Sequence, residues 1–263
     1  MASPTILALD FDGVLCDGLI EYFQTAWRAY CQLFDRADGT PPAGLAERFY
    51  PLRPVIETGW EMPLLLHALL EGVTDVAVLA DWPAIAQQIL AGTGLTADRT
   101  MAVVDGVRDR WIRTDLTGWL SQHRFYPGVL EQVQGAIAAG VYPVIISTKE
   151  GRFIQQLLAQ HDLPLEAAQI LGKEVRQPKT ATLQQLLAQP PVGTPGQATI
   201  WFIEDRLLTL HRVAAQPDLD AVTLFLADWG YNTEAERAEA HRDSRIHLLS
   251  LSQLVQGFPA WVA

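Results

Sequence analysis

A short apolar run at residues 6–9 stops abruptly at Asp10, and a glycine follows three residues later. Such a run, ended by acidic residues and a glycine, is typical of a buried strand that leads into a turn. From residue 19 to residue 34 the apolar positions recur with the spacing of an amphipathic helix, and a helical pattern continues to about residue 118. The sequence therefore predicts one strand, a loop and then a helix-rich block that contains no strand.

The pattern changes after a junction at residues 124–129, where apolar runs of strand length begin to alternate with helical segments. Expected strands lie at 141–147, 169–171, 198–203, 221–226 and 245–249, and expected helices at 130–140, 153–162, 180–189 and 207–216. Strands that alternate with helices form a parallel, doubly wound α/β sheet with helices on both faces. We therefore predict a core made of residues 1–16 and 120–263, with residues 17–119 inserted as a helical domain.

Composition and charge narrow the classes of function. Apolar residues make up 49% of the 263 residues, which suffices for one large core or for a core with a smaller second domain. The net charge of -11 would repel a phosphate backbone, so nucleic acid is not an expected partner. The two cysteines, Cys16 and Cys31, fit a reducing compartment, and no apolar run is long enough to span a membrane. We expect a cytoplasmic protein that does not act at a membrane.

Two carboxylates follow the first strand. Asp10 and Asp12 are two residues apart, so in an extended backbone both side chains point to the same side, and Gly13 lets the chain bend sharply after them. Neighbouring carboxylates repel unless a cation or a shared proton compensates, and oxygen ligands suit a hard ion such as Mg2+. A plain polar turn is the alternative interpretation of this short stretch.

Polar residues also end two later strands. Glu204 and Asp205 close one apolar run, while Ser147 and Thr148 close another just before a predicted helix. Backbone N–H groups at a helix N-terminus favour a phosphate, although the hydroxyls also suit an ordinary N-cap. In open parallel sheets, ligands bind beyond the carboxyl ends of the strands. These groups are therefore expected at one edge of the sheet.

Lysine is scarce in the chain. Its three lysines, Lys149, Lys173 and Lys179, all follow the second or third strand of the predicted core. Lys179 begins a predicted helix and is the preferred candidate for a cation at the strand ends. Lys173 is the next candidate, and a solvated surface lysine is the alternative to both.

In this order the residues resemble the four motifs of the haloacid dehalogenase superfamily. The stretch "LALDFDGVL" is similar to its first motif, "VIIST" to its second, Lys179 to its third and "WFIED" to its fourth. The stretch "YPGV" before the helix at 130–140 resembles the subgroup whose helical cap is inserted after the first motif, as in phosphoglycolate phosphatases. The resemblance implies a Rossmann-like core with an inserted helical cap.

The resemblance also implies roles for individual residues. Asp10 would be the nucleophile that forms an aspartyl-phosphate, and Asp12 would act as general acid and then as general base. Mg2+ would be held by Asp10, the backbone carbonyl of Asp12, and Asp205, with Glu204 beside them. The transferring phosphoryl group would be held by Ser147, Thr148, Gly13 and Lys179.

The expected reaction is hydrolysis of a small phosphorylated metabolite, because the Asp10 and Asp12 pair favours phosphoryl chemistry in this superfamily. A phosphosugar mutase shares the motifs and stays an alternative, as does a binding or regulatory protein without turnover. In the inserted domain Arg53 is the candidate for contact with an anionic part of the substrate. Residues 227–237 are expected to form a loop beside the site, with packing as its main role. The sequence does not indicate an oligomeric state.

Overall fold

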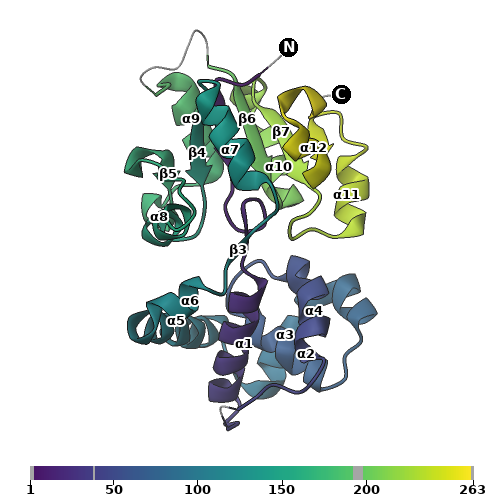
Figure 1. The fold of residues 1–263 in the computed structure, drawn as a ribbon. Helices are drawn as coiled ribbons and strands as arrows, with labels where there is room; N and C mark the ends of the chain where they lie inside the picture. The colour runs from purple at the N-terminus through teal and green to yellow at the C-terminus, as the bar shows by residue number, and fades with distance from the viewer. Residues whose placement is uncertain (1–2, 38, 192–197, 262–263) are drawn as a thin grey trace. The chain divides into compact units, whose positions relative to one another are not determined.

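A computed structural model describes residues 3–37, 39–191 and 198–261, and it divides the chain into two compact units. One unit, the α/β unit, comprises Met1–Asp17 and Arg124–Ala263, and the other, the helical unit, comprises Gly18–His123. Figure 1 shows the two as a strand-containing part and an all-helical part joined by two segments of chain. None of the described helices is both long and apolar enough to cross a membrane.

The α/β unit is built on a six-stranded parallel sheet in the order β5-β4-β1-β6-β7-β8. The strands are β1 Ile6–Leu9, β4 Tyr142–Ile146, β5 Ile170–Leu171, β6 Ile200–Glu204, β7 Thr223–Ala227 and β8 Ile246–Leu249. The first strand lies in the middle of the sheet, where Ile6 is paired with Tyr142 on one side and with Ile200 on the other. The predicted parallel α/β fold is confirmed.

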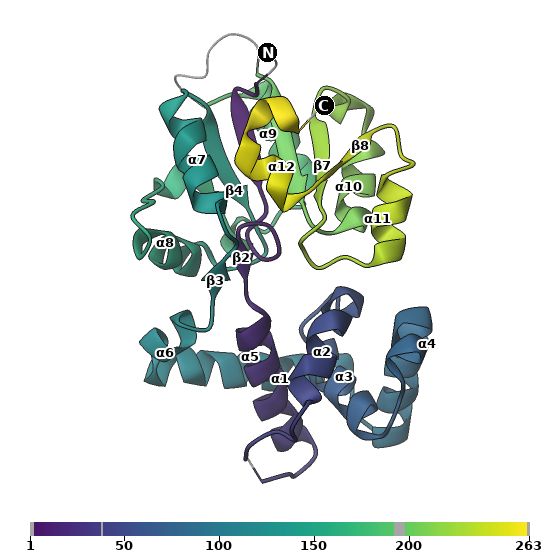
Figure 2. The ribbon, with the colours of Figure 1, turned by 45° about the vertical axis from the view of Figure 1, so that its right-hand side comes forward.

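Helices cover both faces of this sheet, as Figures 1 and 2 show. Helices α7 Val129–Ala138 and α12 Leu251–Gln256 pack together over one face, with α8 Gly151–Ala159 against β5. Helices α9 Lys179–Ala188, α10 Leu207–Ala214 and α11 Glu234–Ala240 cover the other face. On that face, alternate strand residues such as Ile6, Ala8 and Phe202 join leucines of α9 and α10 in one buried cluster. Short 3-10 turns lie at Ala167–Gln169, Lys173–Val175, Pro217–Leu219 and Phe258–Ala260.

Two short strands were not predicted. β2 Cys16–Asp17 and β3 Arg124–Phe125 pair antiparallel at the two points where the chain leaves and re-enters the α/β unit. With two residues each, they are too short to show a period of hydrophobic and polar positions. The predicted loop at 227–237 is also only partly correct, because α11 begins at Glu234 with a capping box formed by Thr233 and Glu236.

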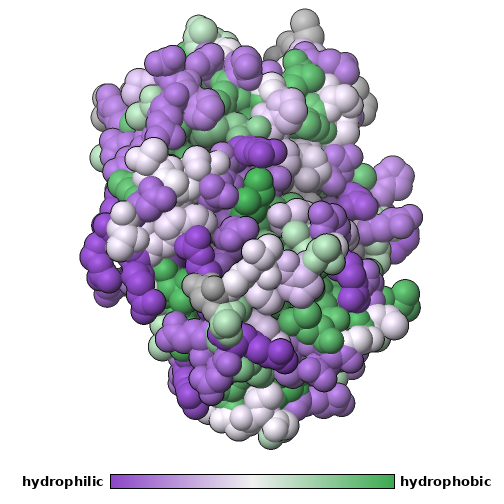
Figure 3. Space-filling model, turned by 60° about the horizontal axis from the view of Figure 1, so that its bottom comes forward, coloured by the Kyte–Doolittle hydropathy of each residue, from purple (hydrophilic) through white to green (hydrophobic). Residues whose placement is uncertain are grey.

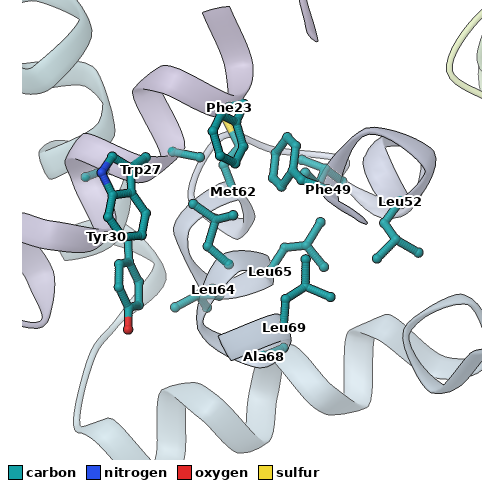
Figure 4. Packing of buried hydrophobic residues seen from close by; sticks show 14 of the residues in the cluster. Phe23, Trp27, Tyr30, Phe49, Leu52, Met62, Leu64, Leu65, Ala68 and Leu69 are labelled. Atoms are coloured by element: carbon teal, nitrogen blue, oxygen red, sulfur yellow. The ribbon is translucent and has the colours of Figure 1, made fainter. Parts of the chain in front are cut away.

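The helical unit contains α1 Leu19–Leu33, α2 Leu45–Phe49, a 3-10 helix at Tyr50–Val55, α3 Glu61–Leu70, α4 Asp75–Thr93, α5 Ala97–Thr114 and α6 Leu116–Leu120. Helix α4 is kinked at Asp81, whose backbone is not helical, two residues before Pro83. Aromatic residues of α1, leucines of α3 and Phe49 form a core of their own (Figure 4). The unit therefore has an independent hydrophobic core.

On the face of the molecule seen in Figure 3, hydrophobic residues form separate small patches among polar ones.

A buried acid links three helices of this unit. Glu21 on α1 is 1% exposed, and its carboxylate accepts hydrogen bonds from Thr25 Oγ1, Arg108 Nε and Trp119 Nε1 at 2.7, 2.8 and 3.1 Å. Arg108 belongs to α5 and Trp119 to α6. The charge of Glu21 is thus paired and hydrogen-bonded inside the unit, as a buried carboxylate requires.

We expect Glu21→Ala to lower the free energy of unfolding by about 3 kcal/mol, because removing one partner leaves a largely buried arginine without its counter-ion. Urea denaturation followed by tryptophan fluorescence measures the change. Glu47→Ala, at an exposed position of α2, is the matched control and should have little effect. Equal loss of stability in the two variants would show that the Glu21 network contributes nothing specific.

Candidate active site

Polar side chains gather at the carboxyl ends of three adjacent strands. Asp10 follows β1, Ser147 follows β4 and Glu204 is the last residue of β6. Because β1 lies between β4 and β6, the sheet places these ends side by side. The N–H of Asp10 donates to the carbonyl of Ile203 at 2.9 Å, which continues the β1–β6 pairing to the site itself.

Three carboxylates form the centre of the site. Asp10, Glu204 and Asp205 each offer an oxygen, and these oxygens all lie within 4.8 Å of one another. The three residues are only 8%, 1% and 1% exposed. A compact, buried set of carboxylate oxygens has the chemistry that a hard divalent cation such as Mg2+ prefers. The residues therefore fit the metal that the sequence motifs imply.

Lys179 lies among these carboxylates. Its Nζ is 2.9 Å from Asp10 Oδ1 and 2.6 Å from Glu204 Oε2. Burial alone would lower the pKa of Lys179, but the charges of Asp10 and Glu204 raise it above its ordinary value, so the ammonium form is retained. The alternative candidate, Lys173, is exposed in a 3-10 turn. Of the two lysines weighed in the sequence, the structure brings Lys179 to the carboxylates.

One lysine does not balance three buried carboxylates. Burial raises the pKa of Asp10 from 3.8 to about 7, although Lys179 opposes the shift, and Glu204 raises it further. Burial also raises the pKa of Glu204 above its ordinary range. Both shifts arise mainly from burial, because a place that excludes water disfavours the charged form of a carboxyl group. A bound divalent cation would favour the charged form of both groups.

Asp12 lies apart from this cluster and has a lysine of its own. Lys149 Nζ is 3.1 Å from Asp12 Oδ1 and 3.4 Å from Oδ2, and both side chains are largely buried, at 10% and 16% exposed. Lys149 was grouped with the other lysines in the sequence but was not assigned to the site. Lys149 comes directly after Ser147 and Thr148, which follow β4, and this position was the sequence signal that could have identified it.

Gly13 is required by the close approach of two segments. Its φ is +88°, a conformation that favours glycine, and a Cβ at this position would overlap the carboxylate of Asp205. The Gly13 N–H donates to the carbonyl of Cys16 at 2.8 Å, which closes the turn after Asp12. Gly13 thus lets the chain fold tightly against the acid that follows β6.

The loop after β7 positions Asp205, a role that the sequence did not reveal. The N–H of Tyr231 donates to Asp205 Oδ2 at 2.8 Å, and Asn232 Nδ2 donates to the Asp205 carbonyl at 3.0 Å. Gly230 lies so close that a Cβ there would overlap Asp205 Cβ and the Gly13 carbonyl. The loop was expected near the site, but mainly as packing. It also fixes the orientation of a carboxylate.

The remaining predicted residues occupy different environments. Ser147 is buried, and its Oγ accepts a hydrogen bond from the N–H of Lys149 at 3.2 Å, whereas Thr148 is exposed. Arg53 belongs to the helical unit, where its Nη1 donates to the carbonyl of Ile56 at 2.9 Å and its guanidinium lies over the ring of Tyr22. Contact of Arg53 with a substrate stays a prediction.

The raised pKa of Asp10 predicts a pH dependence of stability in the metal-free protein. An unfolded Asp10 loses its proton near pH 4, while the folded residue keeps it to about pH 7. The free energy of unfolding should therefore fall as pH rises between these values, by a total on the order of 4 kcal/mol from this residue. Denaturation in EDTA over this pH range measures the slope. In Asp10→Asn this pH-dependent part of the free energy of unfolding should be absent. A stability difference between variant and wild type that stays constant with pH would contradict the raised pKa of Asp10.

No protein-family model and no curated protein sequence matches the chain, but solved structures match it along nearly its whole length. A predicted phosphoglycolate phosphatase from Haemophilus somnus has a TM-score of 0.59 at 18% identity, over 97% of this chain and 98% of that one. A haloacid dehalogenase-like family hydrolase from Streptococcus pneumoniae has a TM-score of 0.55 at 15% identity, over 95% of each chain. A predicted phosphatase from Clostridium acetobutylicum has a TM-score of 0.55 at 14% identity, over 97% and 98%. The chain therefore has the fold of the haloacid dehalogenase-like hydrolases, as its sequence motifs predicted.

Proposed function

We propose that the protein is a Mg2+-dependent phosphatase that hydrolyses a small phosphorylated metabolite through an aspartyl-phosphate intermediate. The observation that carries the proposal is the cluster of Asp10, Glu204 and Asp205 with Lys179 at the strand ends. The phosphatases among the similar structures agree with this chemistry. The proposed place of action is the cytoplasm, with no nucleic acid or membrane as partner.

Asp10 is the proposed nucleophile. One of its carboxylate oxygens attacks phosphorus, a P–O bond forms to Asp10, and the bond to the leaving oxygen breaks. Asp12 gives its proton to that oxygen, so the product leaves as an alcohol. Asp12 then takes a proton from a water molecule, whose oxygen attacks phosphorus and releases phosphate and free Asp10. Protons and electron pairs balance over the two steps without a redox partner.

Lys149 is the cation that faces Asp12. Its Nζ lies 3.1 Å from Asp12 Oδ1, and in the proposed mechanism this contact orients the carboxyl group. The negative charge of an arriving phosphate offers Lys149 a second partner.

The negative charge of the phosphoryl group is the main electrostatic problem in this acidic site. In the proposed mechanism Lys179 and the Ser147 hydroxyl stabilise the phosphoryl oxygens, together with backbone N–H groups near Gly13 and Thr148. When bound by Asp10, Asp205, Glu204 and the Asp12 carbonyl, Mg2+ would supply positive charge that draws the phosphoryl oxygens and lowers the repulsion with Asp10. We further propose that the helical unit acts as a cap, with Arg53 as a contact for the substrate.

Mg2+-dependent release of phosphate from p-nitrophenyl phosphate should be measurable and should be lost in Asp10→Asn. The variant keeps the size of the side chain but removes the nucleophilic oxygen. Asp12→Asn should lower kcat by at least about a hundredfold, because it removes the acid and base. A wild-type protein that is inert toward this ester and toward a panel of sugar, acid and nucleoside phosphates would favour the non-catalytic alternative. Conversion of a sugar phosphate to its isomer without net phosphate release would favour the mutase.

Lys179→Ala and Lys173→Ala form a matched pair, because both remove a lysine from the segment between β5 and β6. We expect Lys179→Ala to lower kcat/KM by at least about a hundredfold, since it removes the cation that faces Asp10. Lys173→Ala should leave kcat/KM close to wild type. Steady-state kinetics at saturating Mg2+ measures both, and equal effects of the two substitutions would reject the assignment of Lys179.

A further inference from the structure

Tyr231 contacts two carboxylates, one with its backbone and one with its side chain. Its N–H donates to Asp205 Oδ2 at 2.8 Å, and its hydroxyl donates to Asp17 Oδ1 at 3.2 Å. The residue is only 4% exposed, so its ring is held inside the α/β unit. Asp17 is the last residue of β2, whereas Asp205 belongs to the carboxylate cluster. One tyrosine therefore joins the cluster to the two-stranded ribbon of β2 and β3, which Figure 2 shows.

The loop after β7 contacts both sides of this ribbon. Asp17 lies in β2, and a further hydrogen-bond partner of the Tyr231 side chain is Tyr126, the residue after β3. Two residues earlier in the loop, Trp229 Nε1 donates to the carbonyl of Val14 at 3.1 Å. The ring centroids of Trp229 and Tyr126 are 6.4 Å apart, in an edge-to-face arrangement. The ribbon is thus held by the same loop that contacts Asp205.

The backbone on either side of Tyr231 shows why its ring needs an anchor. Gly230 comes before it, and glycine restricts backbone rotation less than any other residue. Asn232 comes after it and is fixed by its side chain, which donates to the Asp205 carbonyl at 3.0 Å. The ring packs against Gly13, where a Cβ would lie 3.0 Å from Tyr231 Cδ2. With the ring held at its hydroxyl end, the rotation that Gly230 allows is restricted, and the N–H stays directed at Asp205.

The donor that contacts Asp205 is neutral, which suits a carboxylate that is to bind a cation. Lys179 faces Asp10 and Glu204 as an ammonium group, so its charge has the same sign as that of an arriving metal ion. The Tyr231 N–H carries no net charge. It therefore orients the Asp205 carboxylate without neutralising it.

We propose that Tyr231 is a positioning residue for the divalent ion: its hydroxyl contacts hold its N–H on Asp205, and Asp205 is thereby kept in the orientation that binds the ion. Orientation of a carboxylate ligand by its hydrogen-bond partners raises the affinity of a metal site, because less ordering is needed when the ion binds. The inference rests on the divalent-ion site of the proposed function, and it adds that the ion affinity depends on the β2–β3 ribbon. All of these residues belong to the α/β unit.

Calorimetric titration of the metal-free full chain with Mn2+ tests the inference without turnover. Tyr231→Phe keeps the ring and the backbone N–H but removes the hydroxyl, and it should weaken Mn2+ binding by about three- to tenfold. This is less than the roughly 10- to 100-fold loss that is usual when a direct hydrogen-bond partner of a ligand is removed. Tyr142→Phe removes a hydroxyl at the first residue of β4, at the opposite end of that strand from Ser147. This control should bind Mn2+ like the wild type.

Activity gives a second measurement. In Tyr231→Phe the Mg2+ concentration for half-maximal phosphatase rate should rise by a similar factor. The kcat at saturating Mg2+ should stay close to wild type, because Asp205 itself is retained. A lower kcat with an unchanged Mg2+ requirement would overturn the inference.

Asp17 supplies an independent pair of variants. Asp17→Ala should weaken Mn2+ binding as Tyr231→Phe does, while Asp17→Asn keeps an oxygen that can accept the hydroxyl and should retain most of the affinity. In the Asp17→Ala background, Tyr231→Phe should have a smaller effect than in the wild type, because the two residues share one hydrogen bond. Equal effects of Tyr231→Phe in the two backgrounds would overturn the inference.

The titrations also separate this inference from the proposed function. Mn2+ binding that is lost in Asp10→Asn but unchanged in Tyr231→Phe would overturn the inference and leave the ion site in place. An equal loss in Tyr142→Phe would overturn it too, because the effect would then be one of general stability. A wild-type protein that binds no Mn2+ would overturn the inference together with the ion site.

Discussion

Repulsion among buried carboxylates is the constraint on which the α/β unit depends. Asp10, Glu204 and Asp205 lie within 4.8 Å of one another at the edge of a hydrophobic sheet, where water cannot screen them. Lys179 compensates part of this charge through contacts of 2.9 and 2.6 Å, while burial raises the pKa values of Asp10 and Glu204. In the proposed function, a divalent cation supplies further positive charge, and the site then accepts a phosphate.

The surrounding structure holds these groups in position. Parallel pairing of β1 with β4 and β6 fixes where Asp10, Ser147 and Glu204 leave the sheet. The close approach of Gly13 to Asp205, and the hydrogen bond from the Tyr231 N–H, fix the third carboxylate. These positions are rigid, because they are set by backbone hydrogen bonds and by close approaches that only glycine allows. Rigid placement of charge is the condition for electrostatic stabilisation of a phosphoryl group.

Much of this could be predicted from the sequence, because acidic residues that end apolar runs carry a strong local signal. Asp10, Asp12, Glu204 and Asp205 were identified in that way, and the alternation of strands and helices predicted the parallel sheet. The pairing of Lys149 with Asp12 was missed because the two residues are 137 positions apart in the sequence. The hydrogen bond from Tyr231 to Asp205 was missed for the same reason, since 26 positions separate them. The β2 and β3 strands were missed because two residues show no periodicity. The choice between Lys173 and Lys179 also required the positions of the side chains.

The α/β unit concentrates three buried carboxylates around Lys179. The central proposal is that these three carboxylates share one divalent ion. Anomalous diffraction from crystals soaked in Mn2+ tests it most directly. We expect one strong peak within coordination distance of Asp10 and Asp205, and a crystal saturated with Mn2+ that shows no peak there would contradict a shared divalent ion.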